Sequence, residues 1–232
     1  MKKIDLSDLE KKINIEFKDK ELLQRALTHR SYLNEHREFT GGHNERLEFL
    51  GDAILELSVT DYLYNFYPQK TEGELTSYRA ALVNTFHLAE VAKRLKVGDY
   101  LLLSKGEARD IGRARQYILA NTMESLIGAI YLDKGYGKAD EFIKTEILSS
   151  AEETIKKNLS RDTKSRFQEK AQEIEGITPT YQVLEESGPD HNKNFLIGLY
   201  LDDKLIATGK GHSKQEAEQK AAQAGLKLKN WE

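Results

Sequence analysis

Residues 44–55 read Asn-Glu-Arg-Leu-Glu-Phe-Leu-Gly-Asp-Ala-Ile-Leu and place three carboxylates in an otherwise apolar run. Glu45, Glu48 and Asp52 stand at positions i, i+3 and i+7, so on a helix they lie within about 60° of one another. The core side of the same helix is expected to hold four apolar residues: Leu47, Leu50, Ile54 and Leu57. Acids gathered on a partly buried helix face are costly to keep ionised unless a cation lies beside them.

A solvated helix face is the ordinary explanation for acids at helical spacing, and the spacing alone leaves that alternative open. A second acid-bearing apolar helix, expected at 118–132, favours a shared site instead. On it, Asn121, Glu124 and Gly128 form one stripe. Gly128, like Gly51 on the first helix, has no side chain, so the two helices could meet closely beside the acids.

If the two stripes face each other, they form a set of oxygen donors: Glu48, Asp52, Asn121 and Glu124. Oxygen ligands without histidine or cysteine suit Mg²⁺ or Mn²⁺ rather than zinc. Such a metal generates a nucleophile at neutral pH and stabilises charge on the attacking and leaving oxygens of a phosphodiester. No plausible Ser-His-Asp arrangement, P-loop or dinucleotide fingerprint occurs, so no organic cofactor is expected.

Composition narrows the class of protein. The chain of 232 residues contains no cysteine, which excludes disulfides and thiolate metal sites and suits a reducing compartment such as the cytoplasm. It has no run of 18 apolar residues, so no membrane partner is expected. The formal net charge is only −3, so a basic surface for nucleic acid must be local. Three histidines lack metal-ligand spacing and are expected to be exposed or hydrogen-bonded: His29, His36 and His43.

Helical periodicity dominates residues 1–158, which we predict to form an all-α domain. The expected helices are 6–16, 20–28, 44–66, 74–84, 85–95, 118–132 and 138–158. Thr71 and Glu74 match a capping box at the start of the helix 74–84. The segment 104–115, rich in glycine and arginine, could contact phosphate or be a solvated connection, and both interpretations remain open.

A charged segment, 159–163, is predicted to link this domain to a second one at 164–232. The expected order there is helix 164–175, strands 180–186, 194–201 and 204–209, and helix 213–229. Asp202-Asp203 is the expected hairpin turn, and Ser213 with Glu216 matches a capping box. The predicted fold is therefore multidomain, with an all-α domain followed by an α+β (α-β-β-β-α) domain.

Residues 44–55 resemble the signature of the ribonuclease III family, and the nine residues 44–52 are a specific match. Residues 28–32 (Thr-His-Arg-Ser-Tyr) and 118–129 (Ile-Leu-Ala-Asn-Thr-Met-Glu-Ser-Leu-Ile-Gly-Ala) resemble two further blocks of that family. The resemblance covers essentially the whole chain. It implies a homodimer that cleaves double-stranded RNA with Mg²⁺-activated water.

The resemblance also implies roles for individual residues. The metal ligands would be Glu48, Asp52, Asn121 and Glu124. Of these, Asp52 and Glu124 would also be catalytic, by orienting the attacking water. The family pattern most often has aspartate where this chain has Asn121. Asparagine offers an oxygen but no charge, which should weaken the affinity for a divalent cation.

Three further roles follow from the resemblance alone. Glu45 would be a catalytic residue near the substrate and the dimer interface. Glu72 would match an acid that the family places in its cleavage valley. Phe49 would be the aromatic side chain that inserts into the partner subunit.

The α-β-β-β-α order resembles a double-stranded RNA-binding domain, which reads the shape of A-form RNA and little of its sequence. This resemblance implies seven RNA-contacting residues: Gln168, Glu169, His191, Lys210, Ser213, Lys214 and Lys220. Backbone N–H groups at the start of the last helix form a ready phosphate site. His191 would enter a minor groove. Gln215 and Glu218 stand where the family often has lysine, so RNA affinity is expected to be modest.

These features predict an endoribonuclease that hydrolyses phosphodiester bonds of double-stranded RNA. It would use Mg²⁺, with Mn²⁺ able to substitute, and would process precursor ribosomal RNA and structured messenger RNA. The alternative is a catalytically impaired double-stranded RNA-binding protein, owing to Asn121. An Asn121→Asp variant distinguishes the two, because it should switch on cleavage only in an impaired parent.

Overall fold

The computed structural model describes residues 5–161, 163–189 and 193–231. Contacts divide the chain into two compact units, one ending at Ile155 and the other beginning at Lys156. The helical unit followed by an α-β-β-β-α unit confirms the predicted fold class.

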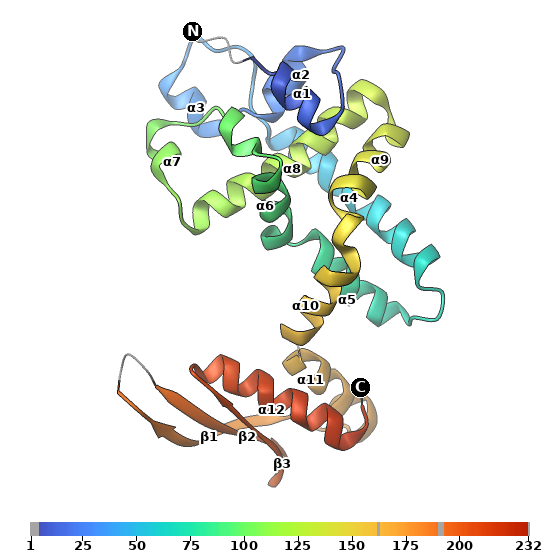
Figure 1. Ribbon diagram of the computed structural model, residues 1–232, viewed down its shortest axis with the longest axis vertical. Helices are drawn as coiled ribbons and strands as arrows, with labels where there is room; N and C mark the ends of the chain where they lie inside the picture. The colour runs from blue at the N-terminus through green and yellow to red at the C-terminus, as the bar shows by residue number, and fades with distance from the viewer. Residues whose placement is uncertain (1–4, 162, 190–192, 232) are drawn as a thin grey trace. The chain divides into compact units, whose positions relative to one another are not determined.

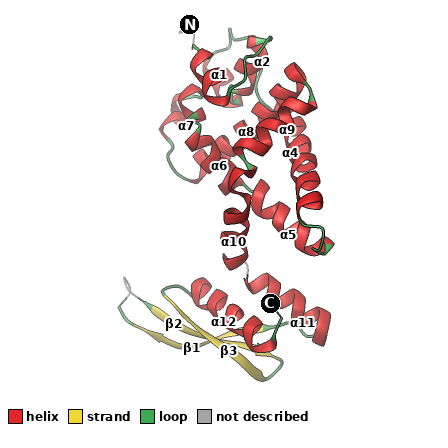
Figure 2. Ribbon diagram, turned by 45° about the vertical axis from the view of Figure 1, so that its right-hand side comes forward, coloured by secondary structure: helices red, strands yellow, loops and turns green. Residues whose placement is uncertain are grey.

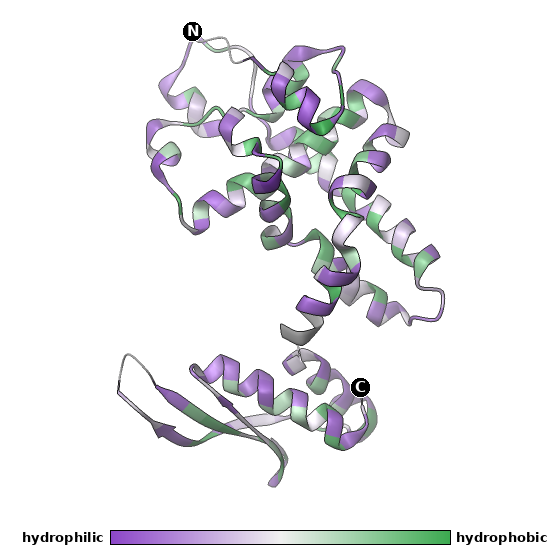
Figure 3. Cartoon of the chain, in the orientation of Figure 1, coloured by the Kyte–Doolittle hydropathy of each residue, from purple (hydrophilic) through white to green (hydrophobic). Residues whose placement is uncertain are grey.

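The first unit is built from helices (Figure 1). They are α1 (Ser7–Ile13), α2 (Lys20–Ala26), α3 (Arg30–Glu35), α4 (Glu45–Phe66), α5 (Glu72–Val83), α6 (Thr85–Arg94), α7 (Lys105–Arg109), α8 (Arg113–Lys134) and α9 (Tyr136–Glu146), with short 3₁₀ turns η1 (Val97–Tyr100) and η2 (Leu148–Ser150). A further helix, α10 (Ala151–Arg161), begins in this unit and continues past its end at Ile155. Figure 3 shows the connection from α4 to α5 as hydrophilic. Nothing in the described stretches forms a helix both long and apolar enough to cross a membrane.

Helix α8 runs through the middle of this unit, and α2, α4, α6 and α9 pack on it (Figure 1). Between residues 118 and 130 its buried residues face all sides of the helix: Ile118, Leu119, Ala120, Thr122, Met123, Ser125, Leu126, Ile127, Gly128, Ala129 and Ile130. A helix that is apolar all round must be surrounded by other elements. Only Asn121 and Glu124 in this stretch remain partly open to solvent.

Two sequence-based expectations for the first unit are wrong. The helix expected at 138–158 is broken, because α9 ends at Glu146 and the η2 turn precedes α10. This bend buries Ile147 and Leu148 in the core. Leu57, expected on the core side of α4, is 57% exposed, whereas Leu47 and Ile54 are buried.

The second unit contains α11 (Thr163–Glu175), β1 (Thr180–Ser187), β2 (Asn194–Leu201), β3 (Lys204–Gly211) and α12 (Lys214–Lys229). The three strands form one antiparallel sheet in the order β1-β2-β3. The hairpin between β2 and β3 turns at Asp202, whose φ of 50° gives the left-handed conformation that such tight turns use.

Both helices of the second unit cover the same face of the sheet (Figure 2). The core between them contains Phe167 from α11, Leu199 from β2 and the alanines of α12. Small residues allow close packing here. A Cβ atom at Gly209 of β3 would lie only 2.2 Å from the carbonyl oxygen of Ala217, so only glycine fits.

The segment predicted as a linker, 159–163, covers the end of α10 and the start of α11. Residue 162 lies outside the described residues. Thr163 is fixed to the second unit, since its Oγ1 donates to the backbone oxygen and to Oε1 of Gln219 at 2.9 and 2.6 Å. The first helix of that unit therefore begins at a defined contact with α12.

Candidate active site

Helices α4 and α8 cross with their backbones in contact (Figure 1). A Cβ atom at Gly51 would lie 1.7 Å from the carbonyl oxygen of Glu124, and one at Gly128 would lie 2.3 Å from the carbonyl oxygen of Leu47. Since real Cβ atoms do not approach backbone atoms this closely, glycine is required on both sides of the crossing. The two glycines therefore bring the acidic stripes of α4 and α8 together.

Four of the predicted site residues meet beside this crossing. The pKa of Glu48 is raised, mainly by burial and further by the charges of Glu45 and Asp52. A side-chain hydrogen bond from Asn121 opposes this rise. Burial, followed by the charges of Asp52 and Glu48, raises the pKa of Glu124 to about 8. Glu48 of α4 and Glu124 of α8 are therefore both partly buried and near enough for their charges to interact.

Glu45 lies at the edge of this group, between the side chains of Arg30 and His43. Arg30 Nη1 is 3.4 Å from its Oε1, and His43 Nδ1 is 3.8 Å from its Oε2. The Nδ1 atom of His43 is buried and has no hydrogen-bond partner among the described residues. The rest of the ring is partly open to solvent, since the side chain is 34% exposed.

The donor set fits a hard divalent cation. Glu48, Asp52 and Glu124 offer carboxylate oxygens and Asn121 an amide oxygen, which are the ligands Mg²⁺ and Mn²⁺ prefer. Within the described ranges, no three carboxylate or histidine side chains already lie close enough to share one ion. Carboxylates of like charge repel one another, and a bound cation would offset that repulsion and displace the proton held by Glu124.

Glu72 lies apart from the group. It begins α5, accepts a hydrogen bond of 3.1 Å from Thr76 Oγ1, and lines a pocket of about 450 Å³ between α4 and α5. Its charge does not contribute to the pKa shift of Glu48 or Glu124. A single chain therefore does not bring Glu72 to the other carboxylates.

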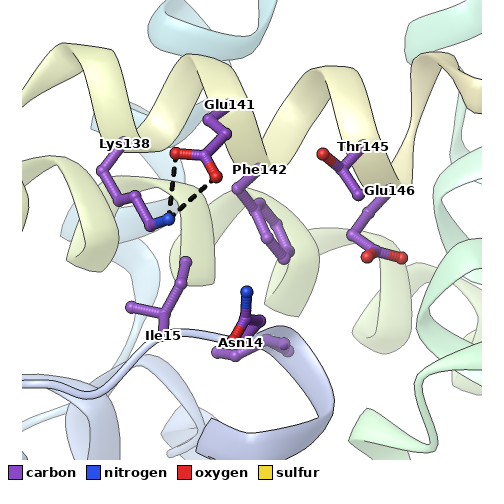
Figure 4. A pocket seen from close by; sticks show the side chains of 8 residues that line it. Asn14, Ile15, Lys138, Glu141, Phe142, Thr145 and Glu146 are labelled. Atoms are coloured by element: carbon purple, nitrogen blue, oxygen red, sulfur yellow. Dashed lines mark hydrogen bonds and ion pairs between the residues drawn. The ribbon is translucent and has the colours of Figure 1, made fainter.

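A smaller pocket of about 50 Å³ lies between the end of α1 and α9 (Figure 4). At its rim Lys138 donates hydrogen bonds of 2.9 Å to both carboxylate oxygens of Glu141, so the two charges compensate each other. The volume admits only a few water molecules. No predicted site residue lines it, and we assign it no catalytic role.

Phe49 projects from α4 into solvent and is 82% exposed. Leu57 and Tyr64, which are 57% and 72% exposed, lie eight and fifteen residues further along the same helix. At about 100° per residue these three side chains fall within about 80° of one another. They form an apolar stripe, called the α4 stripe below, that no other described element covers.

In the second unit, six of the predicted RNA-contacting residues are exposed: Gln168 and Glu169 on α11, Lys210 on β3, Ser213 at the N-cap of α12, and Lys214 and Lys220 on α12. The seventh, His191, lies outside the described residues. Lys214 and Lys220 are about 120° apart around the helix axis. They therefore do not share one stripe of α12.

The capping box expected at Ser213 and Glu216 is only half formed. Ser213 Oγ accepts from the backbone N–H of Glu216 at 3.1 Å. The Glu216 carboxylate, however, accepts from the backbone N–H of His212 at 2.8 Å instead of from Ser213. The reciprocal bond has moved one residue towards the N-terminus.

Sequence reasoning did not assign a role to the block 28–32, which the fold uses as a junction. Thr28 O accepts from the backbone N–H of Asn44 at 2.9 Å, at the start of α4. Ser31 Oγ accepts from the backbone N–H of Ser104 at 3.1 Å. Together with the Arg30–Glu45 pair, these bonds fix the beginning of the acidic helix. In the sequence, this junction was indicated only by the resemblance of residues 28–32 to a block of the ribonuclease III family.

Comparison with known proteins agrees with this geometry. The family model described as "Ribonuclease-III-like" matches residues 19–151, and the model described as "Double-stranded RNA binding motif" matches residues 163–229. The matched segments coincide with the helical unit and the α-β-β-β-α unit. The chain therefore combines a nuclease domain with a double-stranded RNA-binding domain.

Relatives similar over their full length place the chain more narrowly. It is 43% identical over 224 residues to ribonuclease 3 of a Nitratiruptor species, covering 96% of both chains. It is 44% identical over 223 residues to ribonuclease 3 of a Sulfurovum species, covering 96% of this chain and 97% of the relative. The nuclease domain of ribonuclease III from Campylobacter jejuni superposes with a TM-score of 0.54 at 40% identity, covering 66% of this chain and 98% of that domain. The chain belongs to the ribonuclease III family.

Proposed function

We propose that this chain is a Mg²⁺-dependent endoribonuclease that cleaves double-stranded RNA as a homodimer. The observation that carries the proposal is the backbone contact of α4 and α8, the two helices that carry Glu48, Asp52, Asn121 and Glu124. Mn²⁺ should substitute for Mg²⁺, because both prefer oxygen ligands.

Each residue of the site would have a distinct role in metal binding or catalysis. When bound, the divalent cation supplies an activated water and stabilises negative charge on the phosphodiester. Glu48 and Asp52 would hold it from α4, and Asn121 and Glu124 from α8. Glu124 releases its proton on binding, since its pKa of about 8 leaves it mostly protonated at neutral pH without metal.

Glu45 and Arg30 would act at the rim of the site. The exposed guanidinium of Arg30 lies 3.4 Å from Glu45 and offsets part of its charge. That compensation lowers the repulsion that an incoming RNA phosphate meets beside Glu48 and Asp52. Glu45 thereby stays close to the substrate without closing the site to an anion.

The second domain would supply affinity for the duplex. Two basic side chains and one hydroxyl lie near the N-terminus of α12: those of Lys210, Lys214 and Ser213. Backbone N–H groups at this helix end favour a phosphate. Gln168 and Glu169 on α11 would reach the 2′-hydroxyls of a minor groove.

A second copy of the chain would complete the active site. The α4 stripe is self-complementary about a two-fold axis near Leu57, because antiparallel pairing of two such helices sets Phe49 against the partner subunit's Tyr64. Tyr64 lines the 450 Å³ pocket between α4 and α5, and so does Glu72. Insertion of Phe49 there would bring Glu72 of the partner subunit towards Glu48, which explains why a single chain leaves Glu72 apart.

The expected biological substrates are precursor ribosomal RNA and structured messenger RNA in the cytoplasm. This part of the proposal rests on the family's role. The alternative of an impaired RNA-binding protein receives no support from the comparisons, in which relatives similar over nearly their full length carry the name ribonuclease 3.

The test is a cleavage assay with a labelled RNA duplex of about 30 base pairs, which exceeds the roughly 16 that one RNA-binding domain spans. The proposal predicts discrete fragments with Mg²⁺, none with EDTA, and none from single-stranded RNA of the same sequence. Asp52→Asn is the matched control and should bind the duplex without cutting it. Duplex that the parent protein retards on a gel but leaves intact in Mg²⁺ would overturn the proposal.

A further inference from the structure

Lys220 differs from the other lysines of the predicted RNA-binding surface in its partner. Its Nζ lies 2.7 Å from Oε1 of Glu216, one turn earlier on α12. The ammonium of Lys214 instead lies 5.7 Å from the ring centre of Phe195. Among the described residues of the second unit, neither Lys210 nor Lys214 has a carboxylate within ion-pair distance, although the charge of Lys214 acts on Glu186. Lys220 is therefore the lysine of this surface that is directly paired with a carboxylate.

The carboxylate of Glu216 accepts a second hydrogen bond besides the one from Lys220. Its Oε2 accepts from the backbone N–H of His212 at 2.8 Å, at the N-terminus of α12. A lysine ammonium and a free N–H at a helix start are the two kinds of donor that a phosphate would use in this position. The interaction with Lys220, followed by that with the His212 N–H, lowers the pKa of Glu216, so its carboxylate is ionised at neutral pH.

We propose that Glu216 occupies the place of an RNA phosphate at the start of α12 and thereby restrains RNA binding. The proposal rests on the proposed function, since it requires α12 to contact the duplex. An arriving phosphate must either displace the Glu216 carboxylate from Lys220 and His212 or remain beside its negative charge. Displacement needs no unfolding, because the side chains of Lys220 and Glu216 are 54% and 40% exposed.

The orientation of the pair on α12 also explains why the restraint is local. Glu216 and Lys220 share one stripe of α12 near its N-terminus. Glu141 on α9 forms a comparable exposed pair with Lys138 at 2.9 Å, outside the second unit. Neutralising Glu141 removes the same charge and frees a lysine that is not among the predicted RNA-contacting residues. Glu141→Gln is therefore a matched control for a change in net charge.

The test measures the affinity of the full chain for an RNA duplex of about 30 base pairs, in EDTA so that no cleavage occurs, over a series of salt concentrations. Glu216→Gln should bind about three- to fivefold tighter, the effect expected for freeing one exposed ion pair. The slope of log affinity against log salt should steepen by about one, because Lys220 becomes available to one more phosphate. Glutamine keeps an oxygen acceptor for His212, so the unfolding temperature should not change.

The gain must depend on Lys220. Lys220→Gln alone should weaken binding, because it leaves the negative charge of Glu216 uncompensated beside the phosphate. The Glu216→Gln/Lys220→Gln double variant should lose the gain of Glu216→Gln. Glu141→Gln should bind like the parent. This pattern separates release of Lys220 from a general loss of negative charge.

Three results would overturn the inference: Glu216→Gln binding no tighter than the parent, an equal gain for Glu141→Gln, or a gain that persists without Lys220. A parent that binds duplex while Glu216→Gln shows no gain refutes this inference and leaves the proposed function standing. If neither protein binds duplex, both proposals fail.

Discussion

Replacing Gly51 with alanine should push apart the two helices that carry the candidate metal ligands. A Cβ atom there would lie 1.7 Å from the carbonyl oxygen of Glu124, 2.6 Å from its carbonyl carbon and 2.9 Å from the backbone nitrogen of Gly128. All three are backbone atoms, so no side-chain rotation relieves the overlap. An ordinary contact begins at 3.4 Å, so α4 and α8 must separate by about 1 Å or more.

The separation has two measurable consequences. Overpacking of a core contact costs about 1–3 kcal/mol, and the backbone overlap at Gly51 favours the upper end of that range. In a domain of this size such a loss lowers Tm by about 6–10 °C. A displacement of about 1 Å in a catalytic group costs about a hundredfold in rate. Cleavage should therefore fall at least that far, while duplex binding in EDTA stays unchanged because the second unit is untouched.

The assay is single-turnover cleavage of labelled duplex, with thermal unfolding measured on the same preparations. Gly137→Ala is the matched control, since a Cβ atom at that position in α9 meets nothing within 4 Å. Alanine there should leave the rate unchanged and raise stability slightly. A Gly51→Ala protein with the rate and Tm of the Gly137→Ala control would refute the reasoning about the crossing.

Three further predictions follow from the same site. Asn121→Asp should lower the Mg²⁺ concentration for half-maximal cleavage about tenfold, because it adds a charged ligand; an unchanged Mg²⁺ curve would remove Asn121 from the metal site. In EDTA, the free energy of unfolding should fall as pH rises from 4.5 to about 8, because folded Glu124 keeps a proton that the unfolded chain releases. Thermal melts of Glu124→Gln should lack this dependence, and a parent without it would contradict the burial of that carboxyl. Phe49→Ala should shift the dimer towards monomer in light scattering, whereas Tyr117→Ala, which removes an exposed aromatic outside the α4 stripe, should not; equal dimerisation of both variants would argue against the stripe as the interface.

Capping residues and the alternation of apolar residues in the sequence predict several of the helices and strands. The Thr71–Glu74 capping box forms at the start of α5 as predicted, and the alternation of residues in β2 matches its buried face. The break between α9 and α10 was not predictable in this way. It serves to bury Ile147 and Leu148 against the rest of the fold, and no glycine or proline marks it.

The candidate site was predictable where chemistry and helical spacing coincide. Acids at i, i+3 and i+7 with Gly51 and Gly128 beside them predicted the meeting of α4 and α8. The environment of Glu45 was not predictable, because Arg30 and His43 reach it through the fold and not through spacing. The exposure of Leu57 also escaped prediction, since a helical pattern does not distinguish an intramolecular core from a surface that a second chain covers.

Cleavage by the proposed mechanism requires that the residues of α4 and α8 hold the metal. The direct measurement is the single-turnover rate of duplex cleavage across a Mg²⁺ titration, for the parent protein and for Glu48→Gln. The account predicts that the variant binds duplex like the parent in EDTA but needs at least about tenfold more Mg²⁺ for half-maximal cleavage. Superimposable Mg²⁺ curves for the two proteins would contradict it and would place the metal elsewhere.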